Sequence, residues 1–262
     1  MELKPCFFEA FANMQRLGPG STESTQKSMA IYPKKDEPIQ ILDVGCGVGT
    51  PAFLLAENFL NATIIGIDNH MPFIEQLNRS AKEKGLENRL SGLYMSMFEM
   101  TFPDESFDLI WSEGSIFITG FEQGINDWKR LLKAGGYLVC SEASWLTDSP
   151  AEKIYNYWHE QYPEIDTVSN QLKIIEKAGY ALKGHFVLPV TDWTENYYDY
   201  MQINLDVMRK KYAGNMETME YINMFQLEID MYHEYSDAYS YVFYVMEIII
   251  LDYFPMTDRK IN

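Results

Sequence analysis

Short apolar runs alternate with amphipathic segments through the middle of the chain. The apolar runs are rich in Ile, Leu, Val and aromatic residues, as buried strands are, and cover residues 40–44, 63–67, 90–95, 107–111 and 136–141. The segments between them, including 51–60, 72–84 and 124–132, carry apolar residues at helical spacing. This alternation predicts a parallel sheet covered by helices on both faces.

The pattern continues on both sides of these five runs. Ahead of them, 7–17 and 22–32 have helical spacing around a turn at 18–21, with Ser21 as the expected cap of the second helix. Beyond them, we expect helices at 150–161 and 168–178 and strands at 182–189 and 239–250. The predicted fold is therefore α/β, a Rossmann-like, doubly wound sheet of seven strands, with an N-terminal helical segment and a helical insertion between strands six and seven.

The first strand ends in an acid and three alternating glycines. Asp43 is followed by Gly45, Gly47 and Gly49, and the second apolar run ends on Asp68. Glycine lets a strand turn sharply and lets a ligand approach bare backbone. Because a carboxylate at the end of the second strand can accept both hydroxyls of a ribose, the pair of motifs predicts a cofactor that contains adenosine.

The glycine spacing helps to choose that cofactor. A dinucleotide fingerprint reads G-x-G-x-x-G, but its third glycine position is taken here by Thr50. Asp43 would also place a negative charge close to a diphosphate. S-adenosylmethionine has no phosphate, and its ammonium group suits an acid, so we favour it over a nicotinamide or flavin cofactor.

The segment Asp43–Gly49 resembles the first motif of the class I S-adenosylmethionine-dependent methyltransferases. The resemblance continues through Phe102–Ile110, which matches the family's fourth strand, and through Trp128–Val139, which matches its helix, Gly-Gly turn and fifth strand. It covers residues 39–145 and is nearest to the broad group that includes ubiquinone/menaquinone-biosynthesis and glycine/sarcosine methyltransferases. It implies methyl transfer to a small molecule through an N, O or C nucleophile.

The resemblance also implies the cofactor-binding residues. These are Asp43, Gly45, Gly47, Gly49, Asp68, Asn69, Ser96, Met97, Ser112 and Glu113. The chain departs from the family at Ser96-Met97, where an acid often meets the adenine amino group. A serine hydroxyl can still accept a hydrogen bond and a methionine can pack on the ring, so adenine recognition is expected to depend on backbone and apolar contacts.

Two acids follow strands at the edge where the ligands of such a sheet bind. Glu113 comes after the fourth strand and Glu142 after the fifth, and either is a candidate to orient or deprotonate an acceptor. The alternative for each is a structural role, as a helix cap or as the partner of a nearby cation. Glu113 is preferred, because in the family this turn lies beside the sulfonium. No two histidines share metal-ligand spacing, so no metal is expected.

Residues 1–38 are predicted to form a helical cap, and 39–262 the methyltransferase domain. Within that domain, 192–238 is a long insertion rich in aromatic residues and methionine. Many of these side chains fit an ordinary helical core, and others suit a lid over the acceptor pocket or a homodimer interface. The acidic chain and this aromatic lid favour an aromatic or amine acceptor.

The chain has 262 residues and a formal net charge of −17. Such a charge argues against nucleic-acid and anionic-membrane partners, and the basic run Arg209-Lys210-Lys211 is better explained as a solvated helix face. Three scattered cysteines and the lack of a signal-like N-terminus predict a cytoplasmic protein. A protein or RNA methyltransferase and a non-catalytic S-adenosylmethionine-binding module remain as alternatives.

Overall fold

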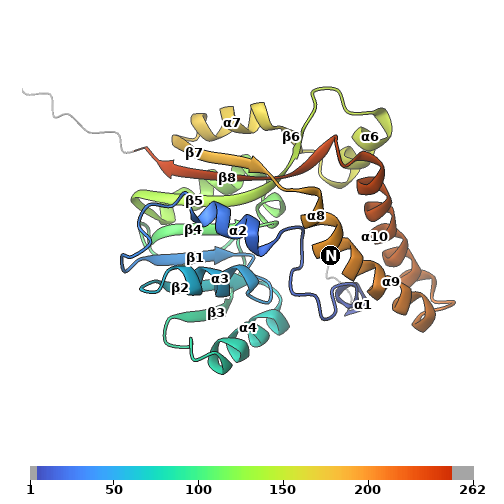
Figure 1. Cartoon of the computed structure of the whole chain (residues 1–262), viewed down its shortest axis with the longest axis horizontal. Helices are drawn as coiled ribbons and strands as arrows, with labels where there is room; N and C mark the ends of the chain where they lie inside the picture. Colours follow the sequence, from blue (N-terminus) through green and yellow to red (C-terminus); the bar gives the residue numbers. More distant parts are fainter. Residues whose placement is uncertain (1–4, 250–262) are drawn as a thin grey trace, which may run out of the picture.

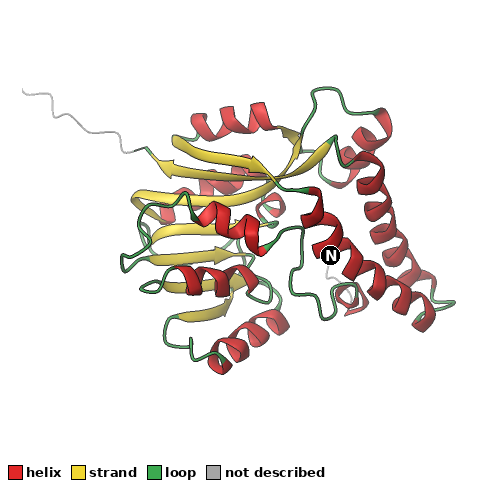
Figure 2. Ribbon diagram, viewed as in Figure 1, coloured by secondary structure: helices red, strands yellow, loops and turns green. Residues whose placement is uncertain are grey.

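A computed structural model of the chain describes residues 5–249, and its centre is one mixed β-sheet (Figures 1 and 2). Its strands are β1 (Gln40–Val44), β2 (Thr63–Asp68), β3 (Leu90–Tyr94), β4 (Phe107–Glu113), β5 (Leu132–Trp145), β6 (Asp166–Thr167), β7 (Tyr180–Val187) and β8 (Tyr239–Ile248). The strand order is β3-β2-β1-β4-β5-β8-β7, and the short β6 pairs with the end of β5. Strands β1 to β5 are parallel, whereas β8 runs antiparallel to both of its neighbours. The carboxyl ends of the parallel strands therefore share one edge.

Helices cover both faces of this sheet. The helices of the described residues are α1 (Pro5–Glu9), α2 (Thr22–Met29), α3 (Thr50–Asn58), α4 (Met71–Glu83), α5 (Phe121–Asp127), α6 (Glu152–Gln161), α7 (Val168–Lys177), α8 (Val190–Trp193), α9 (Asp199–Lys211) and α10 (Met216–Tyr235), with short 3₁₀ turns η1 (Ile116–Ile118) and η2 (Trp128–Leu131). Buried residues fall into two clusters. One joins α2, α3 and α4 to the sheet, and the other joins α5 and α7 to it.

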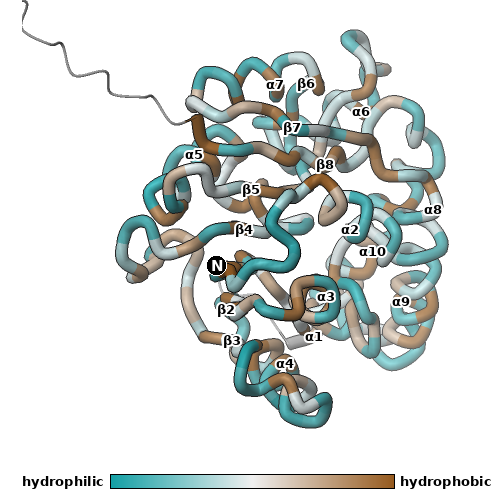
Figure 3. Tube along the Cα trace, turned by 60° about the vertical axis from the view of Figure 1, so that its left-hand side comes forward, coloured by the Kyte–Doolittle hydropathy of each residue, from teal (hydrophilic) through white to brown (hydrophobic). Residues whose placement is uncertain are grey.

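Neighbouring residues of a strand divide between these two clusters. On β1, Ile41 belongs to the first and Leu42 to the second, and on β4 Leu109 and Ile110 divide in the same way. Both faces are therefore buried, as a doubly wound sheet requires, because side chains alternate along a strand. Hydrophobic residues follow β4, β5 and β8 through the centre of the molecule (Figure 3).

All seven predicted strands are present, and the main differences are in length. β5 extends to Trp145 because β8 pairs with it continuously from Tyr137 to Trp145. β6 is an eighth strand of two residues that no periodic pattern indicates. The seventh predicted strand ends at Ile248, and position 250 lies outside the described residues.

The N-terminal segment is less helical than its spacing predicts. Helix α1 ends at Glu9, and the chain then passes through Asn13 at a positive φ of 59°. The second helix is confirmed, and the hydroxyl of Ser21 accepts a hydrogen bond from the Ser24 N–H at 3.0 Å, as its predicted capping role requires.

The insertion is helical, as predicted, and comprises α8, a π-helical stretch η3 (Thr194–Tyr198), α9 and α10. Much of its aromatic content forms core: Trp193 stacks on Tyr232 at 4.5 Å and packs edge-on against Tyr239. In Figure 1, α8 to α10 lie beyond the carboxyl edge of the sheet, with α1 beside them. Among the helices of residues 5–249, none combines the length and apolar character needed to cross a bilayer.

Candidate functional site

A cavity of about 1210 Å³ opens at the carboxyl edge of the parallel strands. Its walls come from the turns that follow β1, β2, β3 and β4, from the start of α4, and from the segment around α1 and residues 15–19. Six of the predicted site residues line it: Gly45, Gly47, Asp68, Asn69, Met97 and Glu113. The fold thus brings together residues from four separate strand ends in one place.

The glycine turn after β1 depends on conformations that other residues rarely adopt. Gly45 and Gly47 have φ values of 71° and 52°, and the N–H groups of Gly45 and Cys46 donate to the carbonyl of Ile67 on β2. A Cβ on Gly45 would lie 2.5 Å from the side chain of Ser115. Glycine is therefore required there for space as well as for φ.

Asp68 is held in place by the turns that surround it. Its Oδ2 accepts a hydrogen bond from the Gly47 N–H at 3.1 Å, and its Oδ1 accepts one from the His70 N–H at 2.8 Å. Burial raises the pKa of Asp68, and these backbone donors oppose that rise. The carboxylate ties the glycine turn to the β2 end and faces the cavity.

Asp43 lies beneath the glycine turn and does not line the cavity. It is 1% exposed, and its Oδ2 has no hydrogen-bond partner among the described residues. Burial and the nearby charges of Glu113 and Asp68 raise its pKa well above the usual range. A cation bound in the neighbouring cavity would oppose this rise in pKa and favour the ionised carboxylate.

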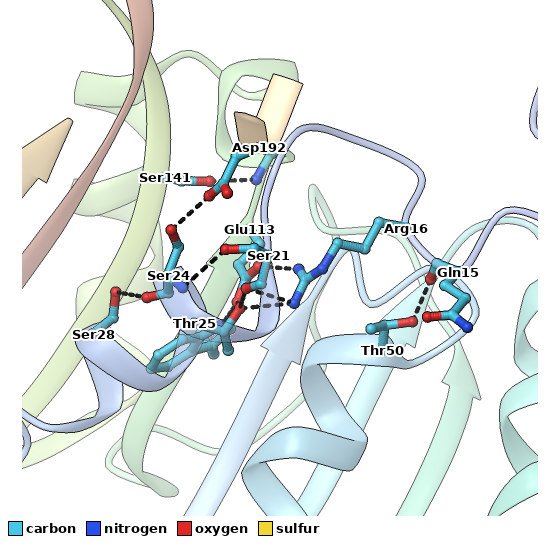
Figure 4. Close-up of polar contacts among 12 residues, drawn as sticks. Gln15, Arg16, Ser21, Ser24, Thr25, Ser28, Thr50, Glu113, Ser141 and Asp192 are labelled. Atoms are coloured by element: carbon cyan, nitrogen blue, oxygen red, sulfur yellow. Dashed lines mark hydrogen bonds and ion pairs between the residues drawn. The ribbon is translucent and has the colours of Figure 1, made fainter. Parts of the chain in front are cut away.

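Glu113 lies in a network that the N-terminal segment completes (Figure 4). Its Oε2 is 2.7 Å from Nη1 of Arg16, and its Oε1 accepts hydrogen bonds from Trp111 Nε1 at 2.9 Å and Thr25 Oγ1 at 2.8 Å. The side chains of Arg16 and Glu113 are only 10% and 7% exposed. Of the two predicted roles for Glu113, this geometry matches the partner of a nearby cation.

Four other predicted residues do not line the cavity. Gly49 precedes α3 with a φ of 94°, and the buried Ser112 hydroxyl lies 2.7 Å from that of Ser115. The Ser96 hydroxyl accepts a hydrogen bond from the Phe98 N–H at 3.2 Å. Glu142 lies on β5 and is completely buried away from the cavity surface. Within residues 5–249, no three His, Cys, Asp or Glu side chains form a group that would hold a metal ion.

Glu142 is an acid without a partner in the interior. Neither carboxyl oxygen makes a hydrogen bond to the described residues. Burial raises its pKa to about 8, against the opposing effect of the neighbouring Tyr162 hydroxyl. The side chain is therefore neutral in the folded protein at neutral pH.

We expect Glu142→Gln to remove a pH dependence of stability. From its ordinary value of 4.5 up to about 8, the carboxyl ionises in the unfolded chain but stays protonated in the fold, so the free energy of unfolding falls with rising pH. Relative to wild type, the glutamine variant should gain on the order of a few kcal/mol across this window. Urea titrations at several pH values test this.

The control for that experiment is Glu75→Gln, which removes an exposed carboxyl from α4. Parallel stability curves for wild type and Glu142→Gln would contradict the buried, neutral state of Glu142.

Sequence reasoning missed the aromatic and cationic contribution of the N-terminal segment. Phe8 of α1 stacks on His70 at 3.9 Å, beside Asp68, and Phe7 packs against Phe225 of α10 at 5.1 Å. Arg16 pairs with a residue 97 positions away. No local spacing signals such contacts, because they arise only when the segment lies across the folded sheet.

Comparison with known families identifies the domain. Residues 35–204 match the family model described as "Methyltransferase domain". A sterol 24-C-methyltransferase of Aspergillus fumigatus is 33% identical over 147 residues, which cover 53% of this chain and 37% of that protein. The methyltransferase GfsG of Streptomyces halstedii is 29% identical over 161 residues, 60% of this chain and 56% of that protein. The chain thus matches only part of the length of these relatives.

Solved structures share the fold at low sequence identity. An S-adenosylmethionine-dependent methyltransferase from Thiobacillus denitrificans, in complex with S-adenosylhomocysteine, has a TM-score of 0.82 at 17% identity, over 95% of this chain and 100% of that one. A second, from Geobacter sulfurreducens with the same ligand, has a TM-score of 0.79 at 16% identity over 94% and 98%. The family-level resemblance is confirmed, while the ubiquinone-like subgroup stays a prediction. The chain belongs to the methyltransferase domain family, with the fold of the S-adenosylmethionine-dependent enzymes.

Proposed function

We propose that the chain transfers the methyl group of S-adenosylmethionine to a small-molecule acceptor, with both bound in the cavity at the carboxyl edge of the sheet. One observation carries the proposal: the glycine turn, Asp68 and Met97, from three separate strand ends, line a single cavity. In an open α/β sheet, this edge is where ligands bind.

The residues present suit this donor. Gly45 and Gly47 line the cavity with backbone that carries no side chain, and the positive charge of an amino-acid ammonium or a sulfonium would favour the ionised form of Asp43 behind them. A dinucleotide fits poorly, because Arg16 is the single Lys or Arg among the residues that line the cavity and it is already paired with Glu113.

Most of the predicted cofactor-binding residues have a proposed role. Asp68 accepts the ribose hydroxyls, Asn69 lies beside it, and Met97 packs on the adenine. Gly49 and Ser112 support the turns behind the cavity. A contact of Ser96 with the adenine stays a prediction, because its hydroxyl is engaged within its own turn.

Bound S-adenosylmethionine supplies a methyl group on a positively charged sulfur, already activated for in-line displacement. The protein therefore has to align the acceptor and exclude water. Residues Gln15–Pro19 form part of the cavity wall, and Arg16 fixes this segment to Glu113. We propose that residues 1–38 act as a cap for this purpose. We propose that 192–238, which contributes no residue to the cavity wall, acts as a lid by supporting that cap through contacts such as that of Phe225 with Phe7.

A small acceptor is favoured over a macromolecule. The volume of about 1210 Å³ exceeds the roughly 300–1000 Å³ of a pocket for one small ligand, so it has room for donor and acceptor together. In the basic run on α9, Arg209 pairs with Asp206 and Lys211 with Glu9, which leaves little positive surface for RNA. The partly similar sterol methyltransferase also supports a small organic acceptor.

We also propose a cytoplasmic location, and we keep the helical insertion 192–238 as a candidate homodimer interface. Buried free thiols at Cys46 and Cys140 agree with a reducing compartment.

Labelled methyl donor tests the activity directly. The purified protein is incubated with labelled S-adenosylmethionine and fractionated metabolite extract, and label is sought in organic products. Transfer into a small molecule is the expected result. If the donor binds but no extract or macromolecule accepts label, the non-catalytic binding module becomes the better description.

A further inference from the structure

The Arg16–Glu113 pair lies on the cavity wall, where the N-terminal segment meets the end of β4. If the donor takes the glycine turn, Asp68 and Met97, the remaining wall is mainly apolar. It includes Phe7, Phe11, Leu17, Pro19, Phe117 and Ile118, with polar side chains at Gln15, Thr50 and Ser115. Arg16 and Glu113 are the charged side chains that remain with them.

The charges of Arg16 and Glu113 neutralise each other in an ion pair. Arg16 Nη2 donates to the Ser21 carbonyl at 3.0 Å and to Thr25 Oγ1 at 2.9 Å, in addition to the 2.7 Å contact of Nη1 with Glu113. Both oxygens of Glu113 are engaged, by Arg16 on one side and by Trp111 and Thr25 on the other. A charged acceptor would have to displace one of these partners and leave the other ion buried without compensation, which is costly.

We propose, on the basis of the proposed function, that the acceptor is an uncharged, largely hydrocarbon molecule. Arg16 determines this specificity by neutralising Glu113. The pair leaves no net charge in the acceptor part of the wall, and the apolar side chains then favour a ligand that gains from leaving water. Of the aromatic or amine acceptors that the sequence favours, a cationic amine is therefore excluded.

The test measures binding of three probes with one carbon skeleton, in the presence of saturating S-adenosylhomocysteine. They are naphthylmethanol, naphthylmethylamine and naphthoate, which are neutral, cationic and anionic at pH 7. Calorimetry is performed on wild type, Arg16→Met, Glu113→Gln and the double variant. Wild type should bind the alcohol about tenfold or more tightly than either ion.

The single variants should change the preferred charge in opposite directions. Arg16→Met leaves Glu113 unpaired and should shift the amine-to-alcohol affinity ratio by about tenfold towards the amine, while Glu113→Gln should shift preference towards the carboxylate. The double variant, with no charge at either position, should again prefer the alcohol. Arg16→Lys, which retains the positive charge, should keep the wild-type order.

Four results would overturn the inference: a wild-type preference for either ion, failure of all three probes to bind, single variants that leave the ratios unchanged, or an Arg16→Lys protein that prefers the amine. Failure of S-adenosylhomocysteine itself to bind would instead reject the proposed function. The two failures are therefore distinguishable in the same titrations.

Discussion

Replacing Asp68 with alanine is expected to weaken S-adenosylmethionine binding by about 100-fold or more. The carboxylate holds the Gly47 and His70 N–H groups, at 3.1 and 2.8 Å, and in the proposed complex it also accepts the ribose hydroxyls. Hydrogen bonds to a charged group contribute about 1.5–3 kcal/mol each, so losing the two from the ribose hydroxyls gives an effect of this size. Calorimetry with S-adenosylhomocysteine measures it.

Asp104→Ala provides the matched control, because it removes a carboxylate from an exposed pair with Arg130, away from the cavity. Its donor affinity should equal that of wild type. An Asp68→Ala protein that keeps its fold and binds within threefold of wild type would show that the ribose is held elsewhere.

Gly45→Ala is expected to abolish donor binding and to destabilise the fold by more than a positive φ alone explains. The new Cβ would lie 2.5 Å from both Cβ and Oγ of Ser115, whose hydroxyl donates to the Val44 carbonyl at 2.7 Å. Relief of this clash must move the glycine turn or break that hydrogen bond. We expect a loss of roughly 3 kcal/mol or more in the free energy of unfolding, the size of a severe local clash.

Gly85→Ala measures the stability cost of a side chain at positive φ in the absence of a steric clash. Gly85 has a φ of +67°, close to the +71° of Gly45, but no atom lies within 4 Å of its added Cβ. It should cost about 1–2 kcal/mol and leave donor binding unchanged. Equal stability losses in the two variants would mean that Ser115 moves aside freely and that the turn tolerates a side chain.

The parts of the fold that sequence alone predicts are those with strong local patterns. The strand before Gly45 and the strand that ends at Asp68 each combine an apolar run with a glycine or an acid at its end, so their positions in the chain were predictable, whereas their register was not. β6 could not be predicted, because two residues have no periodicity and pair only where β5 passes them. The region after Glu9 was expected to be helical but is shaped by contacts with distant elements, such as the bonds from Asn204 of α9 to the carbonyls of Ala10 and Ala12.

The candidate site also contains residues whose place could be predicted from the sequence and residues whose place could not. Topology predicts that residues at the ends of parallel strands share one edge, and six of the ten predicted cofactor-binding residues line the cavity at that edge. The environment of Glu113 was not predictable, because two of its partners, Arg16 and Thr25, are distant in the sequence. Glu142 follows the same topological rule, yet its side chain is buried away from the cavity, since the sequence does not show how far β8 extends along β5.

Calorimetry of the wild-type protein with S-adenosylmethionine, S-adenosylhomocysteine and NAD is the most direct test of the central claim. We expect micromolar binding of the two sulfur ligands and no heat of binding with NAD. Binding of NAD, with neither sulfur ligand bound, would contradict the assignment of the glycine turn and Asp68 to a methyl donor.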